Sequence, residues 1–273
     1  MAAFAPMYFA VASRVLPGNN HDDRTRGLLA MRLRRTGFEC AADDVVDTVR
    51  RAVVHRRPLL AARHLSSALR AEIARARGEM LTRIASVEPR LAHTALMTLL
   101  ASRSPDTYQH ALRVGRTSAA LARALGVALD QIPDIRRAAL LHDIGKAAVP
   151  ARILGLRGRP SEDEVLALRL HVTIGEEVLA TVPALGTIAM MVGATHERLD
   201  GGGYPHGLSG ADIPLGSRII AVADVYDAMT SIRPYRSPLR HDEANRELAR
   251  VAGTQLDPDV VAAWIRMTGA RPC

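Results

Sequence analysis

The chain has 273 residues, 48% of them hydrophobic, so it is long enough for one large domain or two smaller ones and is not disordered. Aromatic residues make up only 3%, and a core that rests on aliphatic side chains favours a mostly α fold. Most of the net charge of +8 lies in residues 1–90, where 16 scattered arginines without interleaved aromatics favour a solvated basic surface over a nucleic-acid-binding module.

Features that indicate targeting or oxidation are few. Cys40 and Cys273 are the only cysteines, and no spacing pairs them, which indicates a reducing compartment. The apolar opening MAAFAPMYFAVASRVL lacks a basic start, and Arg14 interrupts it well short of a membrane span. We therefore expect a soluble, cytoplasmic protein with no transmembrane segment and no nucleic-acid partner, while attraction to anionic ligands or membrane surfaces stays open.

Residues 1–63 alternate strand-like and helical patterns in the order β-α-β-α. This order faintly resembles the start of a response-regulator receiver domain. However, Pro17-Gly18-Asn19-Asn20 stands where a receiver places acidic residues, and no phosphoacceptor aspartate follows the apolar run 58–62. We interpret the segment as a small α/β unit, either a degenerate receiver-like domain or another sensory domain. The alternative is a basic helical platform for dimerisation.

Residues 64–90 predict a polar, arginine-rich helix that we interpret as a connector. From residue 91 the apolar periodicity is helical, and Ser161 with Glu164 forms a capping-box pattern at one helix start. Prolines divide this region into segments of helix length: Pro105, Pro133, Pro150, Pro160, Pro183, Pro205 and Pro214. Residues 91–273 therefore predict an all-α helical bundle.

The stretch LLHDIGKAAVP at 140–150 contains one of three His-Asp dipeptides in the chain. The other two, His21-Asp22 and His241-Asp242, lie among polar residues that predict exposure to solvent. His142 and Asp143 fall instead on an apolar segment that predicts a buried helix ending near Gly145. Two titratable residues placed there must be paired or must coordinate a ligand.

Further candidate ligands follow at positions compatible with helices. Asp106 and His110 lie four residues apart and so share a helix face, and His171 lies among apolar positions. His196 and Asp224 come next along the chain. A single histidine on an apolar helix is more often a satisfied core residue than a ligand. So many His and Asp sites in one stretch argue against that interpretation for all of them.

These residue types suit a particular metal chemistry. Neutral imidazole together with carboxylate suits first-row metals such as Fe, Mn or Zn, and the absence of cysteine ligands argues against a structural zinc site. The carboxylate of an adjacent His-Asp pair has two oxygens and can bridge two metals while the imidazole holds one. Such a pair of metals polarises a phosphate ester and generates hydroxide near neutral pH. The residues therefore predict metal-assisted cleavage of a phosphate ester.

Five segments together are similar to those of HD-GYP domains, the branch of the HD phosphohydrolase superfamily associated with cyclic di-GMP breakdown. They are HDIGKAAVP at 142–150, His171, HERLDGGGYPHGLSGADIP at 196–214, SRIIAVADVYDAMTSIRPYR at 217–236 and GTQLDPDVV at 253–261, in the family's order. The resemblance covers residues 91–273. It implies an all-α domain that holds two divalent metal ions, Fe or Mn.

The resemblance also implies roles for individual residues. It makes metal ligands of His110, His142, Asp143, His171, His196 and Asp224, with Asp143 bridging the metals. Asp106 falls where some members place a glutamate ligand of an additional metal, and its shorter side chain reduces the reach to that metal. Substrate contacts fall to Lys146 at the scissile phosphate, to Arg233 and Arg236 at the phosphates, and to the loop Gly201-Gly202-Gly203-Tyr204-Pro205 along the cleft. The glycines of that loop also fit an ordinary surface turn.

The implied activity is hydrolysis of cyclic di-GMP to linear pGpG by a metal-bound hydroxide, with further cleavage to GMP left open. The chain departs from the family at one position, because Thr195-His196-Glu197 replaces the usual HHE. Threonine is a poor ligand for first-row metals, so one coordination position is lost or passes to water. The alternative function is therefore a catalytically impaired module that binds a cyclic dinucleotide or a protein.

Two further interpretations remain at this point. A homodimer or a signalling protein partner is compatible with either function. Hydrolysis of another nucleotide by a general HD phosphohydrolase is weakened by the GYP and RPYR segments, which the wider superfamily lacks.

Lys146 is the only lysine among 36 basic residues. It lies three residues after Asp143, so on a helical turn it faces the same cleft. A compact ammonium on a flexible stem can approach one phosphate oxygen beside crowded metals, where a planar guanidinium needs room for its fork. The alternative is a chance lysine at a solvent-facing helix end.

Overall fold

The structure is a computed structural model of the chain and describes residues 65–156, 158–231 and 237–269. The interpreted segment 1–63, both cysteines, Arg233 and Arg236 lie outside these residues. Within them every regular element is a helix, which confirms the mostly α fold. The α-helices are α5 (Ser67–Ala85), α6 (Ala92–Arg103), α7 (Pro105–Ala124), α8 (Ile132–Leu141), α9 (Ala151–Leu154), α10 (Glu162–Ala180), α11 (Gly186–Gly193), α12 (Leu215–Thr230), α13 (His241–Val251) and α14 (Pro258–Thr268). The 3₁₀ helices are η2 (Pro89–Leu91), η3 (Ile144–Ala148), η4 (Pro183–Leu185) and η5 (Gly210–Asp212).

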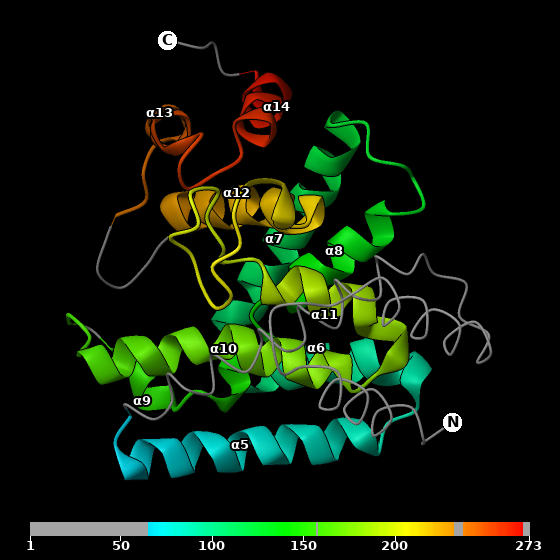
Figure 1. Ribbon diagram of the computed structural model, residues 1–273, viewed down its shortest axis with the longest axis vertical. Coiled ribbons are helices and arrows are strands. Elements are labelled where there is room, and N and C mark those ends of the chain that lie inside the picture. The colour runs from blue at the N-terminus through cyan, green and yellow to red at the C-terminus, as the bar shows by residue number, and fades with distance from the viewer. Residues whose placement is uncertain (1–64, 157, 232–236, 270–273) are drawn as a thin grey trace, which may run out of the picture. The chain divides into compact units, whose positions relative to one another are not determined.

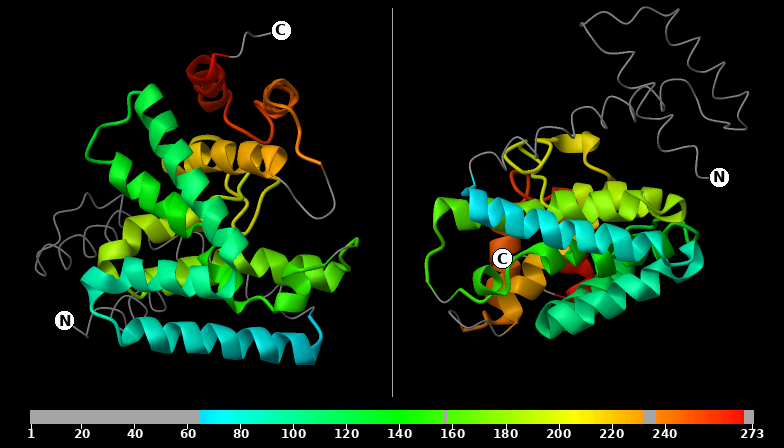
Figure 2. Two further views of the ribbon diagram at one scale, coloured as in Figure 1. Left: turned by 180° about the vertical axis from the view of Figure 1, so that it is seen from behind. Right: turned by 90° about the horizontal axis from the view of Figure 1, so that it is seen from below.

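Helix α7 is the element around which the others gather. It packs against α6, α8, α12 and α14, while α10 packs against α11 and η3. Figures 1 and 2 show α5 beside α10 at one end of this bundle, with α13 and α14 beyond α12 at the other end. Buried aliphatic side chains from all these helices form one continuous core, as the low aromatic content predicts.

Local signals in the sequence set several helix starts. Ser161 is the N-cap of α10: its hydroxyl accepts a hydrogen bond from the Glu164 backbone N–H at 3.3 Å, and the Glu164 carboxylate accepts one from the Ser161 N–H at 2.8 Å. This confirms the predicted capping box. Pro105 begins α7, where its missing N–H has no helical partner to lose. His241 and Asp242 begin α13 and are exposed, as their polar surroundings predict.

Helix α5 does more than connect two parts of the chain. Leu69, Ile73, Met80 and Ile84 form a stripe that is buried against η3 and α10. Ion pairs between Arg77 and Glu177 at 2.6 Å and between Arg152 and Glu72 at 2.9 Å flank this contact. The helix therefore belongs to the same unit as the rest of the bundle, Pro58–Cys273. None of the described helices is both long and apolar enough to cross a membrane.

The helix before the His-Asp pair ends earlier than its sequence suggests. We expect from the sequence a helix that continues to Gly145, but α8 ends at Leu141 and the chain turns into η3. Gly145 explains the turn, because a Cβ built there would lie 1.9 Å from the backbone oxygen of His171 in α10. This close approach to α10 holds His142 and Asp143 at the junction of α8 and η3.

Candidate metal centre

Six candidate ligands that are far apart in the sequence converge at one point of the bundle. They come from five different elements or junctions, so the packing of the helices around α7 brings them together. They are His110 on α7, His142 and Asp143 between α8 and η3, His171 on α10, His196 after α11, and Asp224 on α12.

Asp143 lies at the centre of this cluster. The ligand atoms of His110, His142 and Asp143 all lie within 4.8 Å of one another, and so do those of Asp143, His171 and His196. One carboxylate oxygen of Asp143, Oδ1, is 3.3 Å from His171 Nε2, and the other, Oδ2, is 3.5 Å from His142 Nε2. Two triads that share one carboxylate are the arrangement needed for a bridging ligand between two ions. Asp224 Oδ1 adds a further oxygen, 3.1 Å from His110 Nε2.

Hydrogen bonds to the far side of each ring aim the imidazoles at the centre. His142 Nδ1 lies 2.7 Å from the Ala139 carbonyl oxygen, and His171 Nδ1 lies 2.5 Å from that of Leu168. A carbonyl only accepts, so Nδ1 donates in both rings, which leaves Nε2 as the ring atom that can bind a metal. Both Nε2 atoms therefore lie toward the Asp143 carboxylate.

Two buried polar atoms at the centre are without a hydrogen bond from any described residue. They are His142 Nε2 and Asp143 Oδ1. Both side chains are only 1% exposed, and a buried polar atom without a partner costs free energy. A divalent cation would satisfy both atoms at once, and nitrogen with carboxylate oxygen is a donor set that first-row metals accept. The residues present therefore fit a metal centre.

The protonation of the cluster also suits metal binding. Burial lowers the pKa of His142, and burial with the neighbouring His171 lowers the pKa of His196 to about 4. Both imidazoles are therefore neutral at pH 7. Burial alone would raise the pKa of Asp143, but the nearby Lys146 and His142 bring it well below its usual range. The carboxylate is ionised, as a ligand must be.

His110 is the exception in the absence of metal. Burial by itself would lower its pKa, but hydrogen bonds to Asp224 and Asp227 raise it to about 9. The ring is therefore protonated at pH 7 and must lose a proton before it can bind a metal.

Asp227 is a site residue that we did not predict from the sequence. Its Oδ2 accepts a hydrogen bond from His110 Nδ1 at 2.6 Å, which directs His110 Nε2 toward Asp143 and Asp224. Arg113 holds the carboxylate from the other side with bonds of 2.6 and 2.9 Å. A carboxylate behind a histidine ligand fixes the ring and raises its basicity. The signal in the sequence was the spacing, because Asp227 lies one helical turn after Asp224.

Two residues discussed for the cluster do not join it. Thr195 is buried, and its hydroxyl donates to the Val192 carbonyl at 2.9 Å, so it serves the end of α11 and not the centre. Asp106 is exposed in the first turn of α7 and lies outside both groups of close ligand atoms. The expected extra ligand at Asp106 therefore remains a prediction without support from the geometry.

Lys146 reaches the bridging carboxylate. Its Nζ is 2.6 Å from Asp143 Oδ2, and its side chain is 28% exposed. The ammonium thus lies between the buried Asp143 carboxylate and solvent, and its orientation toward the cleft remains a prediction. A cation at this place can contact an anionic group that approaches from outside.

The loop after α11, yellow in Figure 1, runs between α10 and α12 and forms a wall of the site. The buried Glu197 carboxylate accepts backbone N–H bonds from His206, Gly207 and Leu208 at 2.6, 3.1 and 3.1 Å, which holds the loop in place. Tyr204 stacks on His196 with a centroid distance of 5.2 Å and an interplanar angle of 5°.

This wall lines a cleft of about 380 Å³. The lining includes Gly203 and Tyr204 from the loop and the candidate ligands His196 and Asp224. Gly203 is required by close packing, because a Cβ there would lie 2.4 Å from the Arg198 backbone nitrogen. The loop therefore has a specific place beside the cluster and is not an ordinary surface turn.

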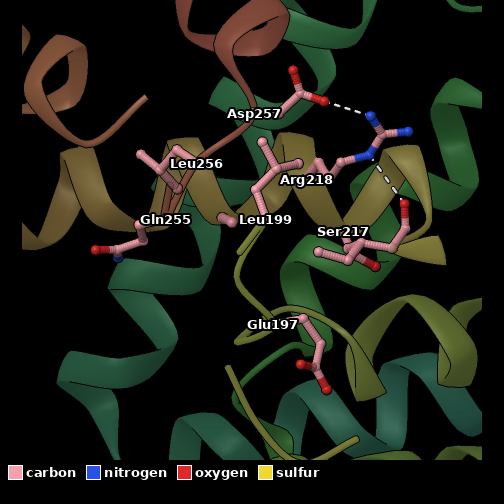
Figure 3. Close-up of a pocket in the computed structure, with 9 residues that line it drawn as sticks. Glu197, Leu199, Ser217, Arg218, Gln255, Leu256 and Asp257 are labelled. Atoms are coloured by element: carbon pink, nitrogen blue, oxygen red, sulfur yellow. Dashed lines mark hydrogen bonds and ion pairs between the residues drawn. The ribbon is translucent and has the colours of Figure 1, made fainter. Parts of the chain in front are cut away.

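A second pocket beside this cleft has a structural role. Figure 3 shows Arg218 joined to Asp257, the N-cap of α14, and Arg218 also donates to the Ile213 carbonyl at 3.0 Å. The space between these side chains is about 10 Å³, which is no more than one water molecule needs. The hydrogen bonds of Arg218 thus connect α12 to α14 and to the loop before α12.

Comparisons with known proteins agree with this geometry. A cyclic di-GMP phosphodiesterase from Thermotoga maritima is 40% identical over 167 residues, covering 60% of this chain and 45% of that protein. The 3'3'-cGAMP-specific phosphodiesterase 3 of Vibrio cholerae serotype O1 is 39% identical over 170 residues, covering 62% of this chain and 37% of that protein. This chain thus spans less than half of the length of either relative.

A likeness in fold and a family match complete the comparison. The crystal structure of a cyclic GMP-AMP specific phosphodiesterase of V. cholerae is similar with a TM-score of 0.51 at 19% identity, covering 65% of this chain and 48% of that one. The model of the family described as HD domain matches residues 94–260, which are more than half of the chain. The predicted resemblance is therefore confirmed, and the chain belongs to the HD domain family.

Proposed function

We propose that the chain is a metal-dependent phosphodiesterase that hydrolyses cyclic di-GMP to linear pGpG. The observation that carries this proposal is the pair of ligand triads that share Asp143 beside a cleft lined by Tyr204. The names of the relatives from T. maritima and V. cholerae support the substrate class of cyclic dinucleotides.

In this proposal one set of residues binds the metals and another set binds the substrate. The cluster would hold the ions through His110, His142, Asp143, His171, His196 and Asp224. Divalent ions bound there supply charge that polarises a phosphate ester and lowers the pKa of bound water. Lys146 binds an oxygen of the scissile phosphate, and the wall of Gly203, Tyr204 and Pro205 confines the substrate. Arg233 and Arg236, outside the described residues, are proposed to hold phosphates.

Metal analysis of protein purified without oxygen, together with a cyclic di-GMP turnover assay, tests the proposal. We expect Fe or Mn in the protein and conversion of cyclic di-GMP to pGpG. Asp143→Ala should lose both metal and turnover, whereas Asp130→Ala, which removes an exposed carboxylate, should retain both. Turnover in metal-free protein, or full activity in the Asp143 variant, would contradict the mechanism.

A second function, binding without cleavage, is favoured by one observation. Thr195 occupies the position of the first histidine of the family's HHE motif. Its hydroxyl donates a hydrogen bond to the Val192 carbonyl and so is not directed at the metal cluster. Tight binding of cyclic di-GMP without product, with metal present, would support this function over hydrolysis. Thr195→His should then restore turnover, because it returns an imidazole to the cluster.

A further inference from the structure

We infer that Arg169 binds the second phosphate of the cyclic dinucleotide, the one that does not lie at the metals. The inference rests on the proposed function and assigns a substrate contact to a residue that is neither a candidate metal ligand nor part of the loop after α11. Arg169 is an exposed residue of α10, and it lines the same cleft as Tyr204 and His196.

Stacking holds the Arg169 side chain over the cleft wall. Its guanidinium carbon lies 5.0 Å from the centroid of the Tyr204 ring, and that ring lies 5.2 Å from the ring of His196. Two successive contacts therefore link this cation to a candidate metal ligand. A guanidinium over an aromatic face keeps its N–H groups at the edge, where they remain available to an anion.

The charge of Arg169 is uncompensated within the described part of the chain. No carboxylate of these residues forms an ion pair with it. Arg198, the other arginine that lines the cleft, is held by Asp200 through bonds of 2.6 and 3.0 Å. Apart from Lys146, which is paired with Asp143 at the cluster, the positive charge that the described cleft offers to a ligand is therefore mainly that of Arg169.

The chemistry of the substrate supplies the anion. A cyclic dinucleotide carries two phosphodiesters on opposite sides of its ring, so only one of them can occupy the metal centre. The other needs a cation some distance along the cleft, and a guanidinium can bind two of its oxygens side by side. Among the described residues Arg169 meets this need from the wall that Tyr204 forms, beside whatever Arg233 and Arg236 contribute to the phosphates.

Steady-state kinetics of the metal-loaded full chain test the inference. We expect Arg169→Ala to raise KM for cyclic di-GMP about 10- to 100-fold, as the loss of a charged hydrogen-bonding partner implies, with a small change in kcat. Turnover of bis(4-nitrophenyl) phosphate, a diester with a single phosphate, should stay unchanged, and so should metal content. Arg169→Lys should recover part of the loss because it keeps the charge.

A matched control and a salt series separate a substrate contact from a structural role. Arg116→Ala removes the same charge from the exposed face of α7 and should leave KM unchanged. The wild-type KM should rise with salt more steeply than that of Arg169→Ala, because one charged contact is screened. An Arg169→Ala variant that matches Arg116→Ala, or that loses metal or both activities equally, would overturn the inference.

Failure of the proposed function gives a different result. If the wild type does not hydrolyse cyclic di-GMP, its binding is measured by calorimetry with the same variants. Weaker binding by Arg169→Ala alone would then support the inference without hydrolysis. Equal binding by all variants, or no binding by the wild type, would reject it.

Discussion

The contact between Lys146 and Asp143 joins the buried cluster to the solvent-facing side of the site. The ammonium lies 2.6 Å from the carboxylate oxygen that also faces His142 Nε2. Lys146 is the only lysine in a chain whose other Lys/Arg positions are all arginine, and this contact offers a reason for it. The contact agrees with a requirement for a small cation, because a guanidinium fork needs more room.

We expect Lys146→Arg to weaken cyclic di-GMP binding or turnover about tenfold while metal content stays unchanged, since Arg keeps the charge but not the compact geometry. Parallel metal analysis and kinetics of the purified variant measure the two effects separately. A variant indistinguishable from wild type would make the lysine a coincidence.

Asp227 is expected to act through His110. At pH 7 metal binding should release about one proton from His110, whose pKa is about 9 in the metal-free protein. Metal affinity should therefore rise with pH until about pH 9. Asp227→Asn removes a partner that raises this pKa, so we expect fewer protons released and a metal affinity about 10- to 100-fold lower.

Calorimetric titration with Mn²⁺ in buffers of different ionisation enthalpy measures both quantities for Asp227→Asn. Ser231→Ala is the control, because Ser231 also donates to Asp227 at 3.1 Å but does not contact His110. Equal proton release by wild type and Asp227→Asn would show that Asp227 does not raise the pKa of His110.

At the scale of the elements, the site depends on how closely η3 lies against α10. Gly145 permits this contact, and the same contact explains why α8 ends before the His-Asp pair. The position of Asp143 therefore follows from packing between two elements and not from the helix that precedes it.

Gly145→Ala should destabilise the protein by about 3 kcal/mol or more, because the added methyl meets backbone that cannot rotate away. Gly78→Ala on α5, where a Cβ meets nothing within 4 Å, should instead stabilise it by about 0.5–1 kcal/mol. Urea unfolding of the two variants checks both signs. An unchanged midpoint for Gly145→Ala would mean that η3 and α10 separate easily.

At the scale of the whole molecule, α5 is part of the bundle that carries the site. Its four buried side chains, Leu69, Ile73, Met80 and Ile84, cover η3 and α10, the elements that hold Asp143 and His171. A domain that began at residue 91 would lack α5 and therefore these buried contacts. The boundary near 64 and the role of residues 1–63 stay predictions.

A chain beginning at residue 91 should lose about 6–12 kcal/mol of apolar burial, which is comparable to the whole stability of a domain. We expect it to aggregate or unfold at room temperature. In the full chain, Ile73→Ala should lower the free energy of unfolding by about 2–4 kcal/mol, whereas the exposed Thr82→Ala should change it by less than about 0.5 kcal/mol. Thermal unfolding of the shortened chain, Ile73→Ala and Thr82→Ala measures these changes in stability. A shortened chain that stays folded would support the interpretation of residues 64–90 as a connector.

The helical class, the capped start of α10 and the six candidate ligands could be predicted from the sequence alone. These follow from local patterns: apolar periodicity, Ser161 with Glu164, and polar residues placed on apolar segments. The resemblance then related these residues to one another. Each such signal lies within a few residues of the chain, so it can be read without knowing what packs against it.

How these residues meet depends on the packing of the helices. The sharing of Asp143 by two triads, the hold of Asp227 on His110 and the stacking of Arg169 on Tyr204 each join elements distant in the chain. The early end of α8 and the burial of α5 likewise come from contacts with α10. Packing between helices fixes these positions, and local periodicity carries no information about which helices will touch.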